Sequence, residues 1–356
     1  MNAPTLSPLH GRLALCRPGF ERECLQELEQ AARDAGLAGY ARARESGGHA
    51  EFILHDGSDA GALTVATRWD ALIFARQVLD LIARLEGLDP VDRIGPLLAA
   101  LNERGERFGD LVIEHTDSDA GRELAGLARS LTPPLRVALQ RARLLDAAAP
   151  RHLHVLLLAG DSLLLAAAAP GAAAPDPGGI PRLRFPAGAP SRSTLKLEEA
   201  LLVLLDERER ERWLRAGMTA VDLGAAPGGW TFQLVRRSLR VIAVDNGPMD
   251  RALLDSGLVE HRREDGFRFR PARTVDWLVC DMVEQPRRIA ALMAAWLGER
   301  RCRRALFNLK LPMKKRLVEV RLCLDLIRDA VPGIELRARQ LYHDREEITV
   351  LALPHA

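Results

Sequence analysis

The stretch that decides the fold is Thr219-Ala-Val-Asp-Leu-Gly-Ala-Ala-Pro-Gly-Gly-Trp-Thr231. Residues 220–223 form a short apolar run around Asp222, which predicts a buried parallel strand. Gly224 and the Pro-Gly-Gly sequence at 227–229 interrupt regular structure, and residues 230–237 favour a helix. A strand, a glycine-rich turn and a helix form the first unit of a doubly wound sheet, in which ligands bind at the carboxyl ends of the strands.

This turn differs from two common nucleotide-binding motifs. It has neither the Gly-x-Gly-x-x-Gly of dinucleotide sites nor the Gly-Lys-Ser/Thr ending of a P-loop. Its strand carries the carboxylate of Asp222, which would repel a phosphate and attract a cation. S-adenosylmethionine carries an ammonium and a sulfonium, so it suits such a turn. The alternative is a glycine turn that merely connects a strand to a helix.

Length and composition set outer limits. A chain of 356 residues with 47% hydrophobic residues is expected to form two or three domains. The net charge of +2 gives no argument for or against nucleic acid, so any basic surface must be local. The five cysteines are scattered without a Cys-x-x-Cys pair, which predicts neither disulfides nor a metal site. No apolar run approaches membrane length, and we expect a cytoplasmic protein without membrane association.

The first half of the chain predicts two α/β units. A β-α-β-β order up to residue 54 suggests a ferredoxin-like unit. Residues 72–83 are ambiguous between helix and strand. The next unit is expected to have helices at 91–101, 120–131 and 134–145, the last two separated at Pro133-Pro134, a strand at 110–115, and a hairpin of 152–158 with 162–169. The Pro-, Gly- and Ala-rich stretch that follows indicates a linker.

The second half alternates strands and helices. We expect strands at 220–223, 241–244, 275–280, 304–309, 335–342 and 348–353, with helices at 194–205, 230–237, 287–297 and 315–330. Ser193 or Thr194 is the expected N-cap of the helix at 194–205. The alternation predicts an α/β, Rossmann-like fold. The expected division is 1–68, ferredoxin-like; 69–170, a second α+β unit; 171–190, linker; and 191–356, the Rossmann-like domain.

Polar residues follow several of the apolar strands. Asp245 lies 21 positions after Gly224, a spacing at which a carboxylate holds ribose hydroxyls, although it could instead cap a helix. Asp265 is a candidate acceptor for an adenine amine or a plain turn residue. Asp281 and Lys310 each end their own strand and so meet at one edge of the sheet. Charges placed there are costly unless they are paired or used in chemistry.

Four motifs together resemble a known family: Phe185-Pro-Ala-Gly-Ala-Pro-Ser-Arg-Ser-Thr-Leu-Lys-Leu-Glu-Glu199, Asp222-Leu-Gly-Ala-Ala-Pro-Gly-Gly-Trp-Thr231, Asn308-Leu-Lys-Leu-Pro-Met-Lys-Lys315 and Tyr342-His-Asp-Arg-Glu-Glu-Ile-Thr-Val350. They resemble the FtsJ-like ribose 2′-O-methyltransferases with their Lys-Asp-Lys-Glu tetrad. More narrowly, they resemble the RlmM family, which methylates a cytidine of bacterial 23S ribosomal RNA. The similarity covers nearly the whole chain and implies a THUMP-like RNA-binding region over 69–170.

The resemblance implies a role for each site residue. Lys310 matches the family's proton acceptor, a role that requires a lowered pKa, and Lys196 supplies a second cation. Asp281 fixes Lys310 in position. Glu347 orients both lysines, although Glu346 is a rival for this role. Whether Lys310 removes the proton or only orients the hydroxyl stays open. The expected residues for binding S-adenosylmethionine are Ser193, Gly224, Ala226, Pro227, Gly228, Gly229, Asp245, Asp265 and Asp281. Ala226 stands where near relatives are expected to have cysteine.

The implied partner is 23S rRNA, free or in early assembly, bound by a monomer or weak dimer. Basic residues near the Lys310 strand and in the linker are candidates for phosphate contacts: Arg182, Arg184, Arg192, Arg300, Arg301, Arg303, Arg304, Lys314, Lys315 and Arg316. Aromatic residues make up only 4% of the chain, so recognition should depend on shape and backbone.

Three other functions fit less well. A nicotinamide oxidoreductase is disfavoured by the Pro-Gly-Gly turn, and a catalytically silent RNA-binding protein by the intact tetrad. Base methylation at cytosine C5 needs a nucleophilic cysteine at the strand end, but Cys280 points away from Asp281 on a strand. Amino-group methylation usually shows an (Asn/Asp)-Pro-Pro-aromatic turn, where this chain has Asp281-Met-Val-Glu.

Overall fold

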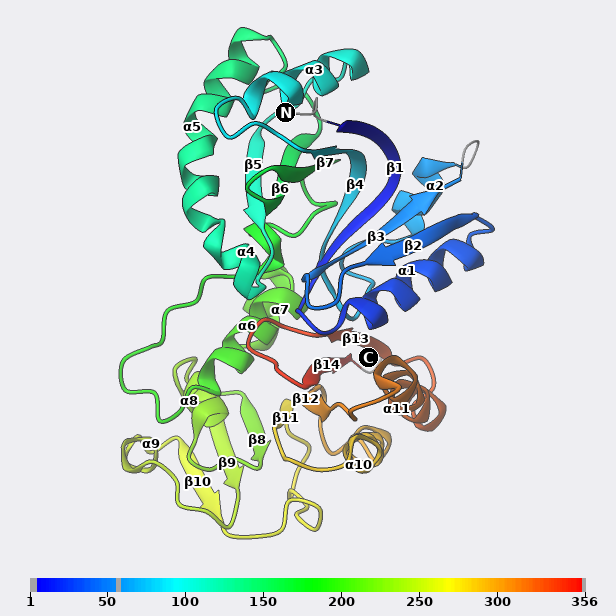
Figure 1. Cartoon of the computed structure of the whole chain (residues 1–356). Helices are drawn as coiled ribbons and strands as arrows, with labels where there is room; N and C mark the ends of the chain where they lie inside the picture. The colour runs from blue at the N-terminus through cyan, green and yellow to red at the C-terminus, as the bar shows by residue number, and fades with distance from the viewer. Residues whose placement is uncertain (1–4, 56–58, 354–356) are drawn as a thin grey trace. The chain divides into compact units, whose positions relative to one another are not determined.

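The computed structural model describes residues 5–55 and 59–353. The chain divides into two compact units, with the division between Pro181 and Arg182. Figure 1 shows the elements of both units along the chain. Among the described helices, none is long and apolar enough to cross a membrane.

The N-terminal unit is built on one seven-stranded sheet of order β2-β3-β1-β4-β7-β6-β5. Its strands are β1 (Thr5–Cys16), β2 (Gly39–Ala43), β3 (His49–Leu54), β4 (Ala75–Glu86), β5 (Leu111–His115), β6 (His152–Ala159) and β7 (Ser162–Ala168). Its helices are α1 (Glu21–Asp34), α2 (Ala60–Ala66), α3 (Ile94–Arg104), α4 (Asp119–Glu123), α5 (Ala125–Arg141) and the single 3-10 turn η1 (Pro177–Gly179).

The ferredoxin-like expectation is confirmed. The chain order β1-α1-β2-β3-α2-β4 gives the antiparallel strand order β2-β3-β1-β4. Strand β4 was ambiguous in the sequence because almost all of its side chains are buried, so it shows no alternation of polar and apolar residues. It pairs with β1 on one side and with β7 on the other, so the sheet runs on without a break into the second set of strands.

The prediction of two separate helices on either side of Pro133-Pro134 is wrong. A single helix, α5, runs through both prolines, and the short α4 precedes it. Each proline inside a helix costs about 3 kcal/mol. The helix nevertheless continues because one face stays buried on both sides of the prolines, where each large apolar side chain contributes about 1.5–3 kcal/mol. The buried residues of that face are Ala128, Leu131, Leu135 and Leu139.

The C-terminal unit is also built on a seven-stranded sheet, of order β10-β9-β8-β11-β12-β14-β13. Six of its strands point in the same direction, and β14 runs antiparallel between β12 and β13, which confirms the Rossmann-like expectation. The strands are β8 (Thr219–Leu223), β9 (Arg240–Val244), β10 (Val259–Arg262), β11 (Trp277–Cys280), β12 (Ala305–Lys310), β13 (Glu335–Arg339) and β14 (Glu347–Leu353).

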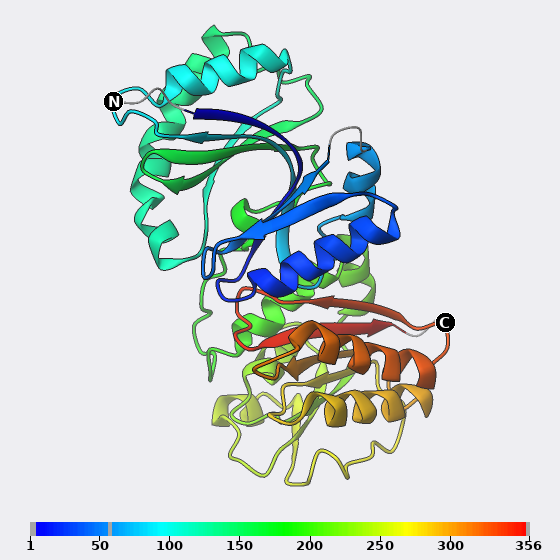
Figure 2. The same cartoon turned by 45° about the vertical axis from the view of Figure 1, so that its right-hand side comes forward.

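Helices cover the C-terminal sheet. They are α6 (Thr194–Leu204), α7 (Glu207–Trp213), α8 (Gly229–Val235), α9 (Arg251–Asp255), α10 (Pro286–Gly298) and α11 (Arg316–Ala330). Apolar residues of α6 and α8 share one core cluster with the sheet. Helices α10 and α11, orange in Figure 2, lie side by side. Helix α7 was not predicted, although Asp206 and Glu209 form a capping box that marks its start.

Arg300, Arg301, Arg303 and Arg304, which the sequence offered as phosphate contacts near the Lys310 strand, do not lie beside Lys310 itself. Strand β12 starts at Ala305 and ends at Lys310, so these arginines precede its amino end. At about 3.3 Å per residue, the two ends of the strand are roughly 20 Å apart. The Arg304 guanidinium lies 4.4 Å from the centre of the Trp213 ring and 5.9 Å from that of Trp277. Arg304 is therefore a packing residue.

We expect Arg304→Ala to destabilise the protein without weakening RNA binding. A cation over an aromatic ring contributes about 0.5–1 kcal/mol, which corresponds to a fall of about 1–4 °C in the unfolding midpoint. Arg303→Ala is the matched control, since Arg303 is 66% exposed and makes only a 3.5 Å ion pair with Asp276. Calorimetric unfolding and RNA titration of the full chain measure both effects. Weaker RNA binding by Arg304→Ala at unchanged stability would contradict the packing role.

Candidate active site

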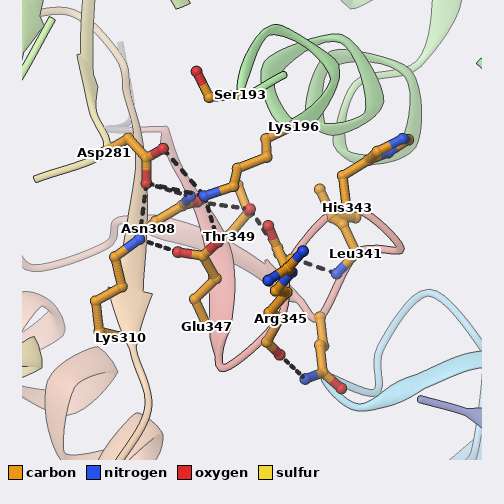
Figure 3. Close-up of polar contacts among 12 residues, drawn as sticks. Ser193, Lys196, Asp281, Asn308, Lys310, Leu341, His343, Arg345, Glu347 and Thr349 are labelled. Atoms are coloured by element: carbon orange, nitrogen blue, oxygen red, sulfur yellow. Dashed lines mark hydrogen bonds and ion pairs between the residues drawn. The ribbon is translucent and has the colours of Figure 1, made fainter. Parts of the chain in front are cut away.

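Four charged side chains form a closed ring at the carboxyl edge of the C-terminal sheet (Figure 3). We call Lys196, Asp281, Lys310 and Glu347 the charge ring. Lys196 Nζ lies 3.2 Å from Asp281 Oδ2 and 2.5 Å from Glu347 Oε1. Lys310 Nζ lies 3.0 Å from Asp281 Oδ1 and also contacts Glu347 Oε2. Each ammonium therefore touches both carboxylates, and the ring has no net charge.

Three neighbouring strands of the sheet and one helix bring these four residues together. Asp281 follows the last residue of β11, and Lys310 is the last residue of the adjacent β12. Glu347 opens β14 directly opposite Lys310 in the antiparallel register. Lys196 comes from the first turn of α6. The strand-end argument from the sequence therefore led to the correct edge for Asp281 and Lys310.

Burial makes the pairing within the ring necessary. The side chains of Glu347 and Asp281 are only 6% and 15% exposed, and those of Lys196 and Lys310 are 19% and 24% exposed. Burial alone would lower the pKa of Lys310, but Asp281 and Glu347 outweigh it and raise that pKa above its ordinary value. The lowered pKa expected for a proton-accepting lysine is therefore not found, and Lys310 holds its proton in the assembled ring.

The choice between Glu346 and Glu347 follows from the strand register. Neighbouring residues of a strand point to opposite faces, so only one of the two can face the lysines. Glu347 does so, and it is buried. Glu346 is exposed and pairs with Arg316 at 3.2 Å.

The glycine turn needs glycine at two positions. Gly224 has a φ of +78°, and a Cβ there would lie 2.7 Å from Met282 Cγ. Gly228 has a φ of +119°, and a Cβ there would lie 2.3 Å from Leu253 Cδ1. Both positions thus combine a left-handed backbone with a close neighbour, so a larger residue would push the turn away from the strand ends.

The predicted cofactor residues occupy different surroundings. Asp245 follows β9 and accepts backbone N–H groups from Ala226 at 3.1 Å and Gly247 at 2.7 Å. Ser193 is the N-cap residue of α6, as expected, but its hydroxyl bonds the Ser191 hydroxyl at 2.7 Å and caps no helix N–H. Asp265 closes its own turn by accepting from Phe267 N at 2.9 Å.

Asp222 differs from the expectation that its charge faces a ligand. It is 1% exposed and accepts the Thr231 hydroxyl at 2.6 Å, across the glycine turn. Burial raises the pKa of Asp222 to about 7, helped by the nearby Asp281 and against the effect of Thr231. Asp222 therefore joins the strand to the helix across the glycine turn instead of facing a ligand.

Sequence reasoning missed four residues that support the ring: Glu199, Asn308, Asp344 and Thr349. Glu199 is buried in α6 and accepts the backbone N–H groups of Tyr342 at 2.7 Å and His343 at 2.9 Å. This contact fixes the segment before β14 to the helix that carries Lys196. All four lie inside the quoted motifs, but a buried polar residue gives no local signal of its partners.

The residues at this edge fit S-adenosylmethionine. Each oxygen of Asp245 accepts one backbone N–H group, and a carboxylate has about four acceptor positions, so room remains for ribose hydroxyls. The carboxylates of Asp245 and Asp281 follow neighbouring parts of the same sheet edge, which suits a ligand that carries cations. The glycine turn follows β8, which lies between β9 and β11 in the sheet, so its backbone reaches the same edge between the two carboxylates.

Comparison with known proteins agrees with this geometry. Residues 189–322 match the model of FtsJ-like methyltransferases, residues 9–79 that of the RlmM ferredoxin-like domain, and residues 92–168 that of the N-terminal region of ribosomal RNA large subunit methyltransferase M. The fold and the matched domain define an S-adenosylmethionine-dependent methyltransferase.

Two relatives narrow this class. Ribosomal RNA large subunit methyltransferase M of Xanthomonas axonopodis pv. citri (strain 306) is 55% identical over 349 residues, or 97% of this chain and 99% of that protein. The protein of the same name from Xanthomonas oryzae pv. oryzae (strain KACC10331 / KXO85) has the same identity and coverage. The chain belongs to the ribosomal RNA large subunit methyltransferase M family.

We expect Asp245→Ala to weaken S-adenosylmethionine binding much more than Asp265→Ala does. Loss of a charged acceptor costs about 1.5–3 kcal/mol, or roughly 10- to 100-fold in affinity. Asp265, also expected at the cofactor from the sequence, is the comparison because its side chain is 51% exposed and closes a turn of its own. Calorimetric titration with S-adenosylhomocysteine measures both affinities, and equal losses in the two variants would reject the assignment of Asp245.

Proposed function

We propose that the chain methylates the ribose 2′-hydroxyl of a cytidine in 23S rRNA. The observation that carries the proposal is the charge ring at the carboxyl edge of an FtsJ-like fold. The relatives named above act, by their name, on ribosomal RNA of the large subunit. Mapping 2′-O-methyl groups on rRNA from a strain that lacks this protein tests the proposal. Loss of a base methyl with every 2′-O-methyl retained would reject it.

The ring suits an oxygen nucleophile that must be aligned. S-adenosylmethionine supplies an electrophilic methyl group when it is bound. A ribose hydroxyl is a weak nucleophile, so the reaction gains most from holding its oxygen in line. Each lysine of the ring has three N–H donors and uses two of them on the ring carboxylates. The third N–H of Lys310 can hold the 2′-oxygen, which gives Lys310 an orienting role as an ammonium.

The hydroxyl proton then needs an acceptor other than Lys310. Asp281 Oδ1 already accepts from Lys310 at 3.0 Å and Asn308 at 2.9 Å, whereas Oδ2 accepts from Lys196 at 3.2 Å. Oδ2 is therefore the less occupied oxygen of a carboxylate that remains 15% exposed. We assign it as the acceptor of the proton that the oxygen releases when its new bond to carbon forms.

Basic side chains close in sequence to the ring are suited to the RNA backbone. Arg192, Lys314, Lys315 and Arg345 are exposed, and each lies within five residues of a ring member. No ion pair joins any of these four to a carboxylate within residues 5–55 and 59–353. Unpaired cations bind phosphates without first losing a partner. We propose that they contact the phosphates that flank the target nucleotide.

The N-terminal unit offers a second surface for RNA. A cavity of about 960 Å³ is lined by Arg17, Arg42, Arg44, Arg84 and Arg122 together with several acids. Glu51 pairs with Arg42 at 2.8 Å and with Arg84 at 2.5 Å, so part of this charge is neutralised internally. Arg44 is exposed and has no such pair among the described residues. We propose that this unit, including the THUMP-like region 69–170, supplies part of the RNA affinity in the cytoplasm.

Lys310→Ala should abolish methyl transfer while cofactor and RNA binding stay close to wild type. Lys310→Arg should keep part of the activity, because arginine preserves the charge and a donor but cannot give up a proton. Single-turnover methylation at saturating cofactor measures all three proteins. Wild-type rates for Lys310→Ala would remove Lys310 from the site.

The pH dependence separates the orienting role of Lys310 from a proton-accepting one. Because the pKa of Lys310 is raised, the ammonium persists throughout the neutral range and is lost only at high pH. An orienting ammonium predicts a single-turnover rate that is flat from about pH 7 to about pH 9. A lysine acting as base through its rare neutral form predicts about a tenfold rise per pH unit over the same range. Such a rise would contradict the assignment.

The double variant Lys314→Ala/Lys315→Ala should bind RNA more weakly. The slope of the logarithm of its binding constant against the logarithm of the salt concentration should fall by about two in magnitude, since each phosphate contact contributes about 0.9. Arg44→Ala should lower the slope by about one. Arg240→Ala is the control, because Arg240 is exposed at the amino end of β9, away from the charge ring. Titration of labelled rRNA at several salt concentrations gives the slopes, and unchanged slopes in both variants would refute these contacts.

A further inference from the structure

A row of buried hydrogen-bonding groups runs from Asp281 into the protein, away from the exposed side of the ring. Asn308 Nδ2 donates to Asp281 Oδ1 at 2.9 Å, and Asn308 Oδ1 lies 2.8 Å from the Thr349 hydroxyl. The same hydroxyl lies 3.0 Å from Asp344 Oδ2. Asn308, Thr349 and Asp344 are all 0% exposed. Part of the row is drawn in Figure 3, and we call it the Asp344 chain.

The register of the sheet places this row of groups beside Lys310 and Glu347. Asn308 and Thr349 face each other across β12 and β14, two positions before Lys310 and two after Glu347. Side chains two apart on a strand share a face, so both pairs lie on the same side of the sheet. Asn308 therefore holds one oxygen of Asp281, the carboxylate that both lysines touch.

The number of protons available determines which group donates in each hydrogen bond of the Asp344 chain. Asp281 Oδ1 accepts hydrogen bonds, so the neighbouring Asn308 must present its amide nitrogen there and its oxygen to Thr349. That oxygen has no hydrogen, so the Thr349 hydroxyl donates to it. A hydroxyl has one proton only. The remaining contact, between Thr349 and Asp344, then needs its proton from Asp344.

We propose that Asp344 is held as a neutral carboxylic acid, and that the Asp344 chain is a positioning device which aims the Asn308 amide at Asp281. The surroundings of Asp344 agree with the proton count. Burial raises the pKa of Asp344 well above its ordinary value, and the nearby Glu347 raises it further. Its Oδ2 also accepts the backbone N–H of Leu341 at 3.1 Å, which fixes the carboxyl group in place.

This inference rests on the proposed function for its kinetic part only. Thr349→Val removes the hydroxyl at nearly constant volume and should lower kcat about tenfold, while KM for rRNA and affinity for S-adenosylhomocysteine change by less than about twofold. Thr349→Ser restores the hydroxyl and should recover most of the rate. Thr67→Val is the matched control, because Thr67 is equally buried in the N-terminal unit and its hydroxyl donates to the helix carbonyl of Leu63.

An infrared measurement tests the proton without using activity. The full-length protein at about pH 8 should show the carbonyl band of a protonated carboxyl group, and Asp344→Asn should remove it. The comparison needs this variant because Asp222 is a second buried carboxyl, with a pKa of about 7. Asp344→Asn keeps a neutral donor, so it should also retain much more activity than Asp344→Leu.

The outcomes separate cleanly. A band that vanishes in Asp344→Asn, together with loss of kcat in Thr349→Val and its recovery in Thr349→Ser, supports the proposal. Absence of the band overturns it, as does a kcat for Thr349→Val equal to that of the Thr67→Val control per folded molecule. If the wild-type protein methylates no 2′-hydroxyl, the proposed function fails, and the infrared band still decides the proton order.

Discussion

The C-terminal unit is organised around the need to neutralise four half-buried charges at once. Two ammoniums and two carboxylates could not share the edge of this sheet unless each touched charges of the opposite sign, because an uncompensated charge in a protein interior costs several kcal/mol. The alternating ring satisfies all four. It also explains the raised pKa of Lys310, since the two carboxylates that neutralise the lysine hold its proton.

This constraint reaches well beyond the four residues. Glu199 fastens the segment before β14 to α6, so that Lys196 and Glu347 meet. Asn308 fills the remaining side of Asp281. The helix, the two strands and the loop between them can therefore shift only together without separating charges. The proposed methylation of a ribose hydroxyl requires such coupling, because a displacement of an ångström at the reacting oxygen lowers the rate steeply.

The sequence predicted the elements that leave a local pattern. Asp281 and Lys310 were identified because each ends an apolar strand, and parallel strands end at one edge. Thr349 and Asp344 were not identified, because a buried threonine in a strand and an aspartate in a loop look the same with or without a hydrogen-bond partner. Helix α5 was misjudged because its tertiary packing outweighs the local effect of Pro133 and Pro134. The position of Arg304 depends on strand direction, which sequence proximity to Lys310 obscured.

The shared strand β4 has a consequence for how such chains can be recombined. It is the last strand of the ferredoxin-like unit, where it pairs with β1, and its other edge pairs with β7. The strands of the two N-terminal parts are therefore joined through β4. In a chimera of two relatives joined between residues 79 and 92, β1 and β7 would come from different parents. Strand β4 would then match only one of its two neighbours. Each mismatch would leave an unpaired edge, which invites aggregation. Exchange of parts between relatives should therefore be tolerated near residues 170–190, where the sheet has ended, rather than between the two N-terminal family matches.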